Sequence, residues 1–248
     1  MSREKPTPAS ADREVSPGGS PIYRHEATGD WQPAAGEEHI EQISAHIEAH
    51  LGPVANVLHE IVSDIVHVDV HVVMPTGRQP CIRLVTSGMS DLPMSTPDNP
   101  DVPRFAELMI TLPPDWQLSQ ASFEDEAWYW PVRLLKSLAR LPHRYGTWLG
   151  RGHTIPNGDP AEPYARNVAF AGAIILPPLT TPDAFRTLQV GPDRRITFYS
   201  VLPLFPAEMD LKLRKGTDAL LDLFDAKHVN DAVDPARRDV TRKRFGLW

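Results

Sequence analysis

The sequence predicts an α+β fold in which a mixed, mainly antiparallel sheet packs with helices in one domain. Apolar residues recur at helical spacing in some segments and at every second position in others. These segments follow the order helix, strands, helix, strands, helix, which differs from the strict alternation of parallel α/β folds. The chain has 248 residues, 41% of them hydrophobic and 23% charged. This length and composition suffice for a sizeable core.

The two ends differ from the middle in composition. The first 36 residues hold many prolines and glycines and no apolar periodicity, so we expect residues 1–36 to form a mostly disordered arm on which Tyr23 and Trp31 could dock locally. One domain is then expected over residues 37–228, and residues 229–248 are expected to form a solvated basic tail. The basic side chains of this tail are Arg237, Arg238, Arg242, Lys243 and Arg244.

The first half of the expected domain holds one helix and three strands. Apolar side chains at helical spacing predict a helix over 37–51, ended by Gly52 and Pro53. Alternation predicts a strand over 65–73, with valines on one face and polar side chains on the other. Two further strands are predicted over 81–86 and 104–112.

The second half of the expected domain holds a helix, two strands and a final helical stretch, and follows a proline-rich connection. A helix is predicted over 130–141, with Pro131 in its first turn and Pro142 at its end. Two strands follow over 168–176 and 195–204, and a final helical stretch runs from 206 to about 228, broken or bent at Gly216. The loop 146–163 lies between the helix 130–141 and the strand 168–176.

Charge and motifs exclude several classes of protein. The 32 acidic residues against 25 basic ones give a net charge of −7, which disfavours a general nucleic-acid binder. The single Cys81 excludes an intrachain disulfide, the N-terminus lacks the apolar stretch of a signal peptide, and the longest apolar run, over 168–176, is too short for a membrane span. We therefore expect a cytoplasmic protein. The phosphate-binding glycine loops, the G-x-S-x-G elbow and H-E-x-x-H are absent, so no catalytic residue and no cofactor is predicted.

One strand carries the best candidate for a metal site. His67, Asp69 and His71 alternate along the predicted strand 65–73, so their side chains share a face. Two histidines and a carboxylate can hold a divalent metal. A flat strand converges such ligands poorly, so a polar sheet face with Asp69 orienting the histidines is the favoured interpretation.

Two loops are candidate binding sites. The segment 86–94 combines small polar residues with methionines that adapt to a partner, although a tight turn at Gly88 with buried methionines is the alternative. The loop 148–159 combines aromatic and charged side chains, or else packs its tryptophan in the core. The candidate partner-binding residues are Thr86, Ser87, Met89, Asp91, Met94, Trp148, Arg151, His153 and Asp159.

Several segments together resemble the suppressor of fused domain family, in family order over about residues 40–225. The ordered set of segments, taken together, carries the resemblance. The segments are VTSGMSD (85–91), RFAEL (104–108), LPPDW (112–116), WPVRLLKSLAR (130–140), TWLG (147–150), GHTI (152–155), FY (198–199), and LPL (202–204) with Glu208. The resemblance implies a compact α+β domain of the shorter, single-domain bacterial type.

The resemblance also implies a function. Animal members restrain transcription factors, and some bacterial relatives are associated with immunity against polymorphic toxins. We therefore interpret the chain as a non-enzymatic protein-binding module, an immunity or regulatory protein whose partner is a protein such as a toxin domain, without nucleic acid or membrane. The alternative is a ligand-binding protein or metal-dependent enzyme that uses His153 or the face of His67, Asp69 and His71.

Overall fold

An eight-stranded sheet runs through the molecule in the order β3–β4–β5–β6–β10–β8–β7, with β9 paired to β10. The computed structural model describes residues 14–24, 39–59, 65–77 and 79–242. All strand pairs in this sheet are antiparallel except β6 with β10, which confirms the predicted fold class. The strands are β3 (Val54–Leu58), β4 (Asp69–Val73), β5 (Ile82–Ser87), β6 (Phe105–Leu112), β7 (Thr154–Pro156), β8 (Gly172–Leu176), β9 (Thr187–Gly191) and β10 (Arg194–Leu204).

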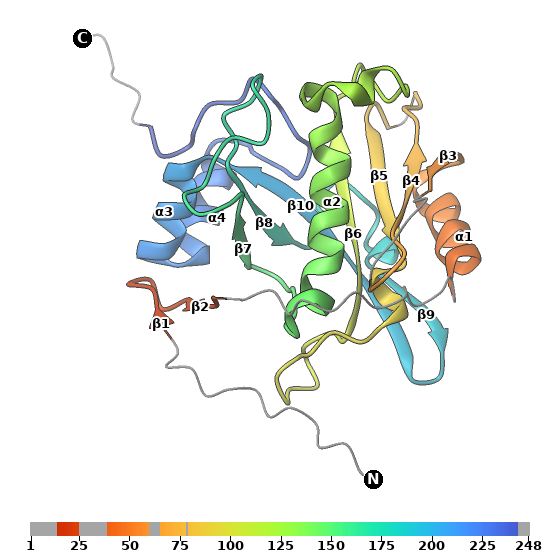
Figure 1. Ribbon diagram of the computed structural model, residues 1–248, viewed down its shortest axis with the longest axis horizontal. Helices are drawn as coiled ribbons and strands as arrows, with labels where there is room; N and C mark the ends of the chain where they lie inside the picture. The colour runs from red at the N-terminus through yellow and green to blue at the C-terminus, as the bar shows by residue number, and fades with distance from the viewer. Residues whose placement is uncertain (1–13, 25–38, 60–64, 78, 243–248) are drawn as a thin grey trace.

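Helices cover both faces of this sheet. The long helix α2 lies across one face, and α1 and the pair α3–α4 pack against the other (Figure 1). Within the described ranges, no helix is long and apolar enough to cross a membrane. The helices are α1 (Ile40–Leu51), α2 (Glu126–Tyr145), α3 (Pro206–Lys215) and α4 (Thr217–Ala226), with short 3-10 turns η1 (Met89–Asp91), η2 (Ser122–Glu124) and η3 (Asp183–Arg186).

The core divides into three clusters that follow this layering. Alternate valines from Val66 to Val72 pack under α2, as their spacing predicts. Ile43 and Ile47 of α1 cover the opposite face, and the α3–α4 pair covers the end formed by β8 and β10. Since both faces are covered, β8 is buried along its whole length, which explains its unbroken apolar sequence.

Some elements differ from those that the sequence predicts. The short strands β3, β7 and β9 were not expected, because their side chains are largely exposed or half-buried and show no clear alternation. Helix α2 begins earlier than predicted, since Asp125 accepts a hydrogen bond from the Ala127 amide at 2.9 Å. It also continues past Pro142 by one turn. The expected interruption at Gly216 is present and separates α3 from α4.

Part of the N-terminal arm is folded. Residues 14–24 form a small hairpin, β1 (Glu14–Val15) with β2 (Pro21–Ile22), where the composition indicated disorder. The Gly18 amide donates to the Leu213 carbonyl at 2.7 Å, and a Cβ at Gly18 would lie 2.4 Å from the Gly216 amide nitrogen. The hairpin therefore docks closely on α3. Trp31 and the rest of the arm lie outside the described residues.

The C-terminal segment 229–242 is also packed, in contrast to the solvated tail expected from its charge. Asp231 accepts hydrogen bonds from the Leu179 and Thr180 amides, both at 3.0 Å, and the Val233 amide donates to the Thr111 carbonyl at 2.8 Å. The domain boundary at residue 228 remains a prediction, but these contacts tie the chain beyond it to the sheet. Lys243 and Arg244 lie outside the described residues.

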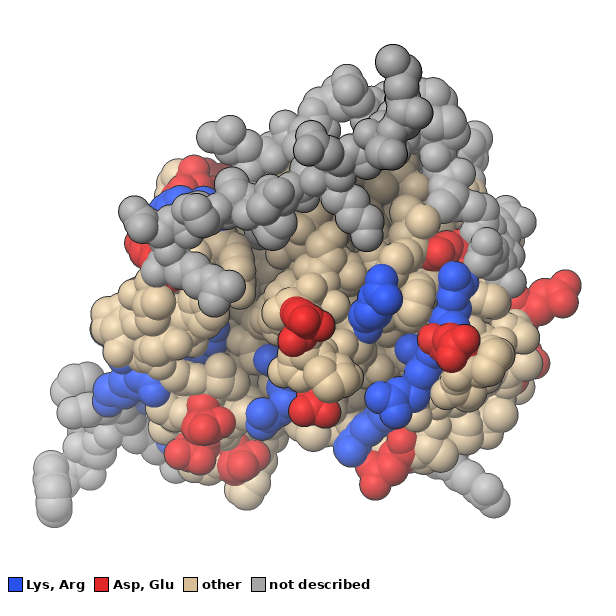
Figure 2. Space-filling view, turned by 90° about the horizontal axis from the view of Figure 1, so that it is seen from below, with Lys and Arg blue, Asp and Glu red and all other residues tan. Residues whose placement is uncertain are grey.

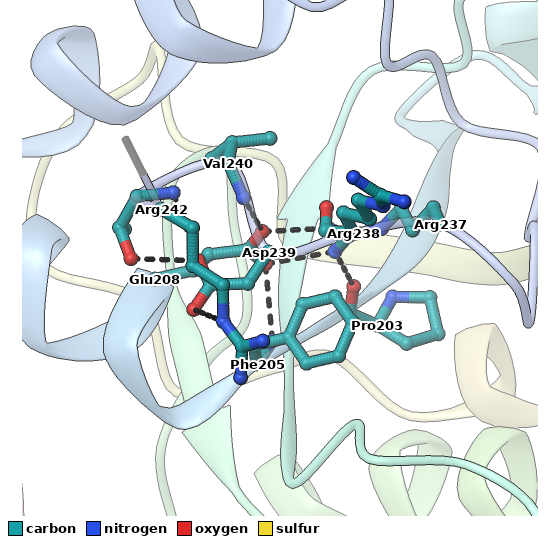
Figure 3. A network of polar contacts seen from close by, with 9 residues as sticks. Pro203, Phe205, Glu208, Arg237, Arg238, Asp239, Val240 and Arg242 are labelled. Carbon is teal, nitrogen blue, oxygen red and sulfur yellow. Dashed lines mark hydrogen bonds and ion pairs between the residues drawn. The ribbon is translucent and has the colours of Figure 1, made fainter. Parts of the chain in front are cut away.

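Arg237 is the centre of this packing (Figure 3). Its guanidinium bonds both carboxylate oxygens of Glu208, at 2.6 and 2.8 Å, and the Pro203 carbonyl at 2.8 Å. Glu208 also accepts from the Phe205 and Val240 amides, each at 3.0 Å. The Glu208 side chain is fully buried and that of Arg237 is 7% exposed, so one arginine of the expected basic tail is a core residue.

Candidate functional site

The turn after β5 is buried. Of the five candidate residues in 86–94, the most exposed is Asp91, at 6%. Gly88 has a φ of +102°, and the methionines lie in the core under α2. This geometry corresponds to the tight-turn alternative. Contact of a partner with these side chains remains a prediction, and it would require the turn to open. The residues are Thr86, Ser87, Met89, Asp91 and Met94.

A buried carboxylate holds this turn in place. Glu107 of β6 accepts hydrogen bonds from the Thr86 hydroxyl at 2.6 Å, from the Ser90 hydroxyl at 2.6 Å and from the Ser90 amide at 2.9 Å. Burial raises the pKa of Glu107, and these donors act in the opposite direction. The side chain has no exposed surface. It therefore supports the turn from inside and is not reached by a substrate.

The residues considered for a metal site form a hydrogen-bonded cluster. Asp69 accepts from His67 Nε2 at 3.0 Å and, through its other oxygen, from His59 Nδ1 at 2.8 Å. His71 Nε2 lies 2.9 Å from the Ser87 hydroxyl instead. Among the described residues, no group of three or more metal-ligating side chains has an arrangement that could hold a metal. His59 was not anticipated because it follows β3, outside the alternating pattern.

Of the four candidate residues in the loop 148–159, Trp148 and His153 are half-buried, and Arg151 and Asp159 are exposed. The Trp148 and His153 rings meet edge to face with centroids 4.2 Å apart, and Tyr23 of the N-terminal hairpin lies 6.4 Å from His153. Burial, and secondly the charge of Lys212, lower the pKa of His153 to about 4. His153 is therefore a neutral packing residue at pH 7, while Arg151 and Asp159 are exposed.

An open cavity of about 300 Å³ lies between this loop and helix α2. Residues 155–158 of the loop form one wall, so the structure brings part of a predicted binding loop to the cavity. We call this cavity the α2 cleft. It is lined by Arg133, Leu134, Ser137, Leu138, Arg140, Leu141, Arg144, Tyr145, Ile155, Pro156, Asn157, Gly158 and Tyr164.

Three arginines of α2 give the cleft a basic character. Arg133 bonds Glu126 at 2.9 Å and the Tyr164 carbonyl at 3.0 Å. Burial, and secondly the neighbouring charge of Arg144, lower the pKa of Arg140. These arginines were missed in the sequence because the helix was analysed for its apolar stripe alone. Their spacing of seven and four residues already placed them on one face.

The basic cleft contrasts with the net charge of −7 of the whole chain. On the face seen from below, lysine and arginine side chains gather in a band with acidic side chains beside it, so charge is unevenly distributed over this surface (Figure 2). At the cleft, the basic side chains are Arg133, Arg140 and Arg144. Such a distribution favours recognition of a short acidic segment over attraction of a long polyanion.

Comparison with known proteins identifies the family. The family described as Suppressor of fused protein (SUFU) matches residues 64–238. The comparison with curated protein sequences gives no match. Among solved structures, a SUFU homologue from Neisseria gonorrhoeae aligns with a TM-score of 0.61 at 15% identity, covering 84% of this chain and 100% of that one.

Two further structures share the fold. One is described as the Sufu–Fu complex, with a TM-score of 0.55, 12% identity and coverage of 84% of this chain and 93% of that one. The other is Drosophila Suppressor of Fused, with a TM-score of 0.52 and 12% identity, where 85% of this chain spans 52% of the other. The family match over most of the chain, together with this shared architecture, shows that the protein belongs to the suppressor of fused family.

Proposed function

We propose that this domain is a non-enzymatic module that binds another protein, and that the α2 cleft is part of its binding surface. The observation that carries the proposal is the cleft itself, an open cavity of about 300 Å³ formed by a predicted binding loop and a basic helix face. A related structure is described as a complex of Sufu with Fu, which supports protein binding within the family.

The burial of the reactive side chains supports a role without catalysis. Ser87 and His71 lie within hydrogen-bond distance, but both have no exposed surface. Glu107 is equally buried, and His153 is held neutral between Trp148 and the N-terminal hairpin. A substrate reaches none of these three buried groups without local unfolding. The enzyme alternative through His67, Asp69 and His71 would likewise need access to Asp69 and His71, whose side chains are buried.

A regulatory or immunity role is the form of protein binding that we propose. The partner would be a protein that is inhibited when bound, such as a toxin domain inside the cell. The net charge of −7 would speed the approach of a basic partner, while the cleft would bind an acidic segment at close range. Direct contact would involve the exposed residues Arg151 and Asp159, of which Asp159 directly follows Gly158 in the cleft lining.

The test is capture of the partner followed by reconstitution. The tagged full chain is used to recover partners from its native cell lysate, mass spectrometry identifies them, and a purified candidate is titrated by calorimetry. Ser137→Trp fills the cleft from an exposed position of α2, and Ala226→Trp places the same ring on exposed α4 as the control. We expect a stoichiometric complex that Ser137→Trp weakens at least about tenfold (about 1.4 kcal/mol).

The two parts of the proposal fail in different ways. If no candidate forms a stoichiometric complex, the protein-binding role is wrong. If a complex forms and both tryptophan variants bind it like the unmodified chain, the binding role stands and the α2 cleft is not its site. Thermal melting of both variants shows whether each one folds.

A further inference from the structure

The N-terminal hairpin, residues 14–24, lies against the loop 148–159, one of the two predicted binding loops. The hairpin sits beside α3 (Figure 1). The centroid of its Tyr23 ring is 6.4 Å from that of His153, and the centroid of the His153 ring is 4.2 Å from that of Trp148. Two residues further along, the same loop forms one wall of the α2 cleft. A partner that binds this loop therefore also meets the hairpin.

A glycine fixes the place where the hairpin docks. The Gly18 amide donates to the Leu213 carbonyl at 2.7 Å. A Cβ at Gly18 would lie 2.4–2.9 Å from backbone atoms of residues 214–216, which cannot move aside as the end of a flexible side chain does. Gly216 has a φ of +89°, and a Cβ there would stand 3.3 Å from the Gly18 carbonyl oxygen. The end of α3 therefore accepts a turn only where that turn has no side chain. We call the surface formed by Leu213, Gly216 and His153 the turn site.

The hairpin is held by few contacts. Each of its strands has two residues, and a two-stranded hairpin by itself is marginally stable in water. Val15 is 57% exposed and Tyr23 is 47% exposed. Across the part of the chain that the structure describes, a single backbone hydrogen bond, from Gly18 to Leu213, joins the hairpin to the rest of the domain. Departure of the hairpin would therefore expose little apolar surface and would leave the sheet intact.

We propose that the hairpin is an exchangeable occupant of the turn site, and that the partner protein replaces it there with a glycine turn followed by an aromatic side chain. The partner's glycine would face Gly216 as Gly18 does, and its ring would lie against His153 as Tyr23 does. Aromatic side chains are enriched among the residues that dominate binding at protein interfaces. The inference rests on the proposed function and specifies the segment of the partner that this surface recognises.

Occupation of the turn site by the hairpin lowers the affinity for a competing partner, because only chains with an open site bind it. A docked-to-open ratio of about 10 reduces that affinity about tenfold. A tethered segment experiences an effective concentration of about 1 mM, so the same ratio corresponds to a Kd of about 0.1 mM for the free segment. Such an exchange is strong enough to regulate binding and weak enough to be measured with a peptide.

The experiment uses the hairpin itself as the probe. The fluorescein-labelled peptide EVSPGGSPIYR, residues 14–24, is titrated with the full chain and followed by fluorescence anisotropy. In the full chain, Gly18→Ala prevents docking of the chain's own hairpin. Gly19→Asn is the control, because this position is exposed, has no atom within 4 Å of a Cβ and has a φ of +78° that asparagine tolerates.

We expect the peptide to bind the Gly18→Ala chain with a Kd of about 0.1 mM. It should bind the unmodified chain and the Gly19→Asn chain about tenfold more weakly, since their own hairpins occupy the site. A peptide that carries the Gly18→Ala change should bind the Gly18→Ala chain at least about tenfold more weakly than the natural peptide does. A captured partner should bind the Gly18→Ala chain about tenfold more tightly than the unmodified chain, and the natural peptide should compete with it.

Several results would overturn the inference. Equal binding of the peptide to all three chains, or no binding up to millimolar concentration, would contradict an exchangeable site. A Gly18→Ala chain without a cooperative thermal transition would show that the hairpin is a fixed part of the fold. A dimer of the unmodified chain that Gly18→Ala abolishes would assign the site to a second copy. If the partner binds all three chains equally, it does not use the turn site and the proposed function stands. Capture of no partner is the failure of the proposed function, which the peptide titration does not share.

Discussion

Gly88 shows how one residue shapes the turn after β5. Its φ of +102° lies in the region that favours glycine, and a Cβ there would stand 1.8 Å from the His67 carbonyl oxygen. Gly88→Ala should therefore lower the free energy of unfolding by more than about 2 kcal/mol, measured by urea denaturation. Gly77→Ala, where a Cβ meets nothing within 4 Å, is the control. Equal stability of both variants would show that the turn relaxes without cost.

His153 gives the protein a defined pH dependence. Its folded-state pKa of about 4 is below the ordinary value of 6.5, so between these pH values the unfolded chain binds a proton that the folded chain does not. The free energy of unfolding therefore falls as the pH falls through this window, and the full contribution is present only above it. From pH 7 to pH 5 this loss amounts to roughly 1–2 kcal/mol.

The variant His153→Gln should lack this part of the pH dependence. Urea denaturation at pH 7 and pH 5 should show a smaller loss of stability for His153→Gln than for the unmodified chain. His228→Asn removes an exposed imidazole at a positive φ of 57°, which asparagine tolerates, and is the matched control. If both variants lose as much stability as the unmodified chain, His153 is not the group that titrates.

The C-terminal segment depends on one ion pair. Arg237→Ala would leave the fully buried Glu208 carboxylate without its cation and would remove the guanidinium that lies over the Phe170, Phe205 and Phe224 rings. We expect a loss of about 3–5 kcal/mol in the free energy of unfolding, because an uncompensated buried charge is costly. The adjacent and exposed Arg238→Ala should stay within about 0.5 kcal/mol. Similar losses in both variants would contradict this assignment.

At the level of elements, the sequence was informative where periodicity was strong. The helical spacing in α1 and the alternation in β4 and β6 are visible because each buries a complete stripe or face. The short strands β3, β7 and β9 depend on neighbours that pattern alone does not identify. Pro142 predicted a helix end one turn early: α2 continues to Tyr145 although this proline has no amide hydrogen to donate to the Leu138 carbonyl.

The candidate site required the three-dimensional arrangement. The arginines of α2 and the residues 155–158 meet only because β7 pairs with β8 and brings the loop beside the helix. Likewise, Arg237 and Glu208 are 29 residues apart, and the charge of the tail alone indicated solvation. The spacing of the arginines along α2 can be recognised in the sequence. The position of residues 155–158 opposite α2 depends on the sheet topology and cannot.

On the scale of the whole molecule, the C-terminal boundary of the folded unit is testable. A chain ending at residue 228 would match the boundary that the sequence predicts, but it would lose the Asp231 hydrogen bonds, the Val233 contact with β6, the Arg237–Glu208 pair and the buried Val240. These losses affect the sheet, the α3–α4 pair and the core at once, and together they are comparable with the roughly 5–15 kcal/mol that stabilises an average domain. We expect this chain to show no cooperative thermal transition and no near-ultraviolet circular dichroism. A chain ending at residue 242 keeps all these contacts and should unfold cooperatively. If both chains melt alike, residues 229–242 are an appendage and not part of the fold.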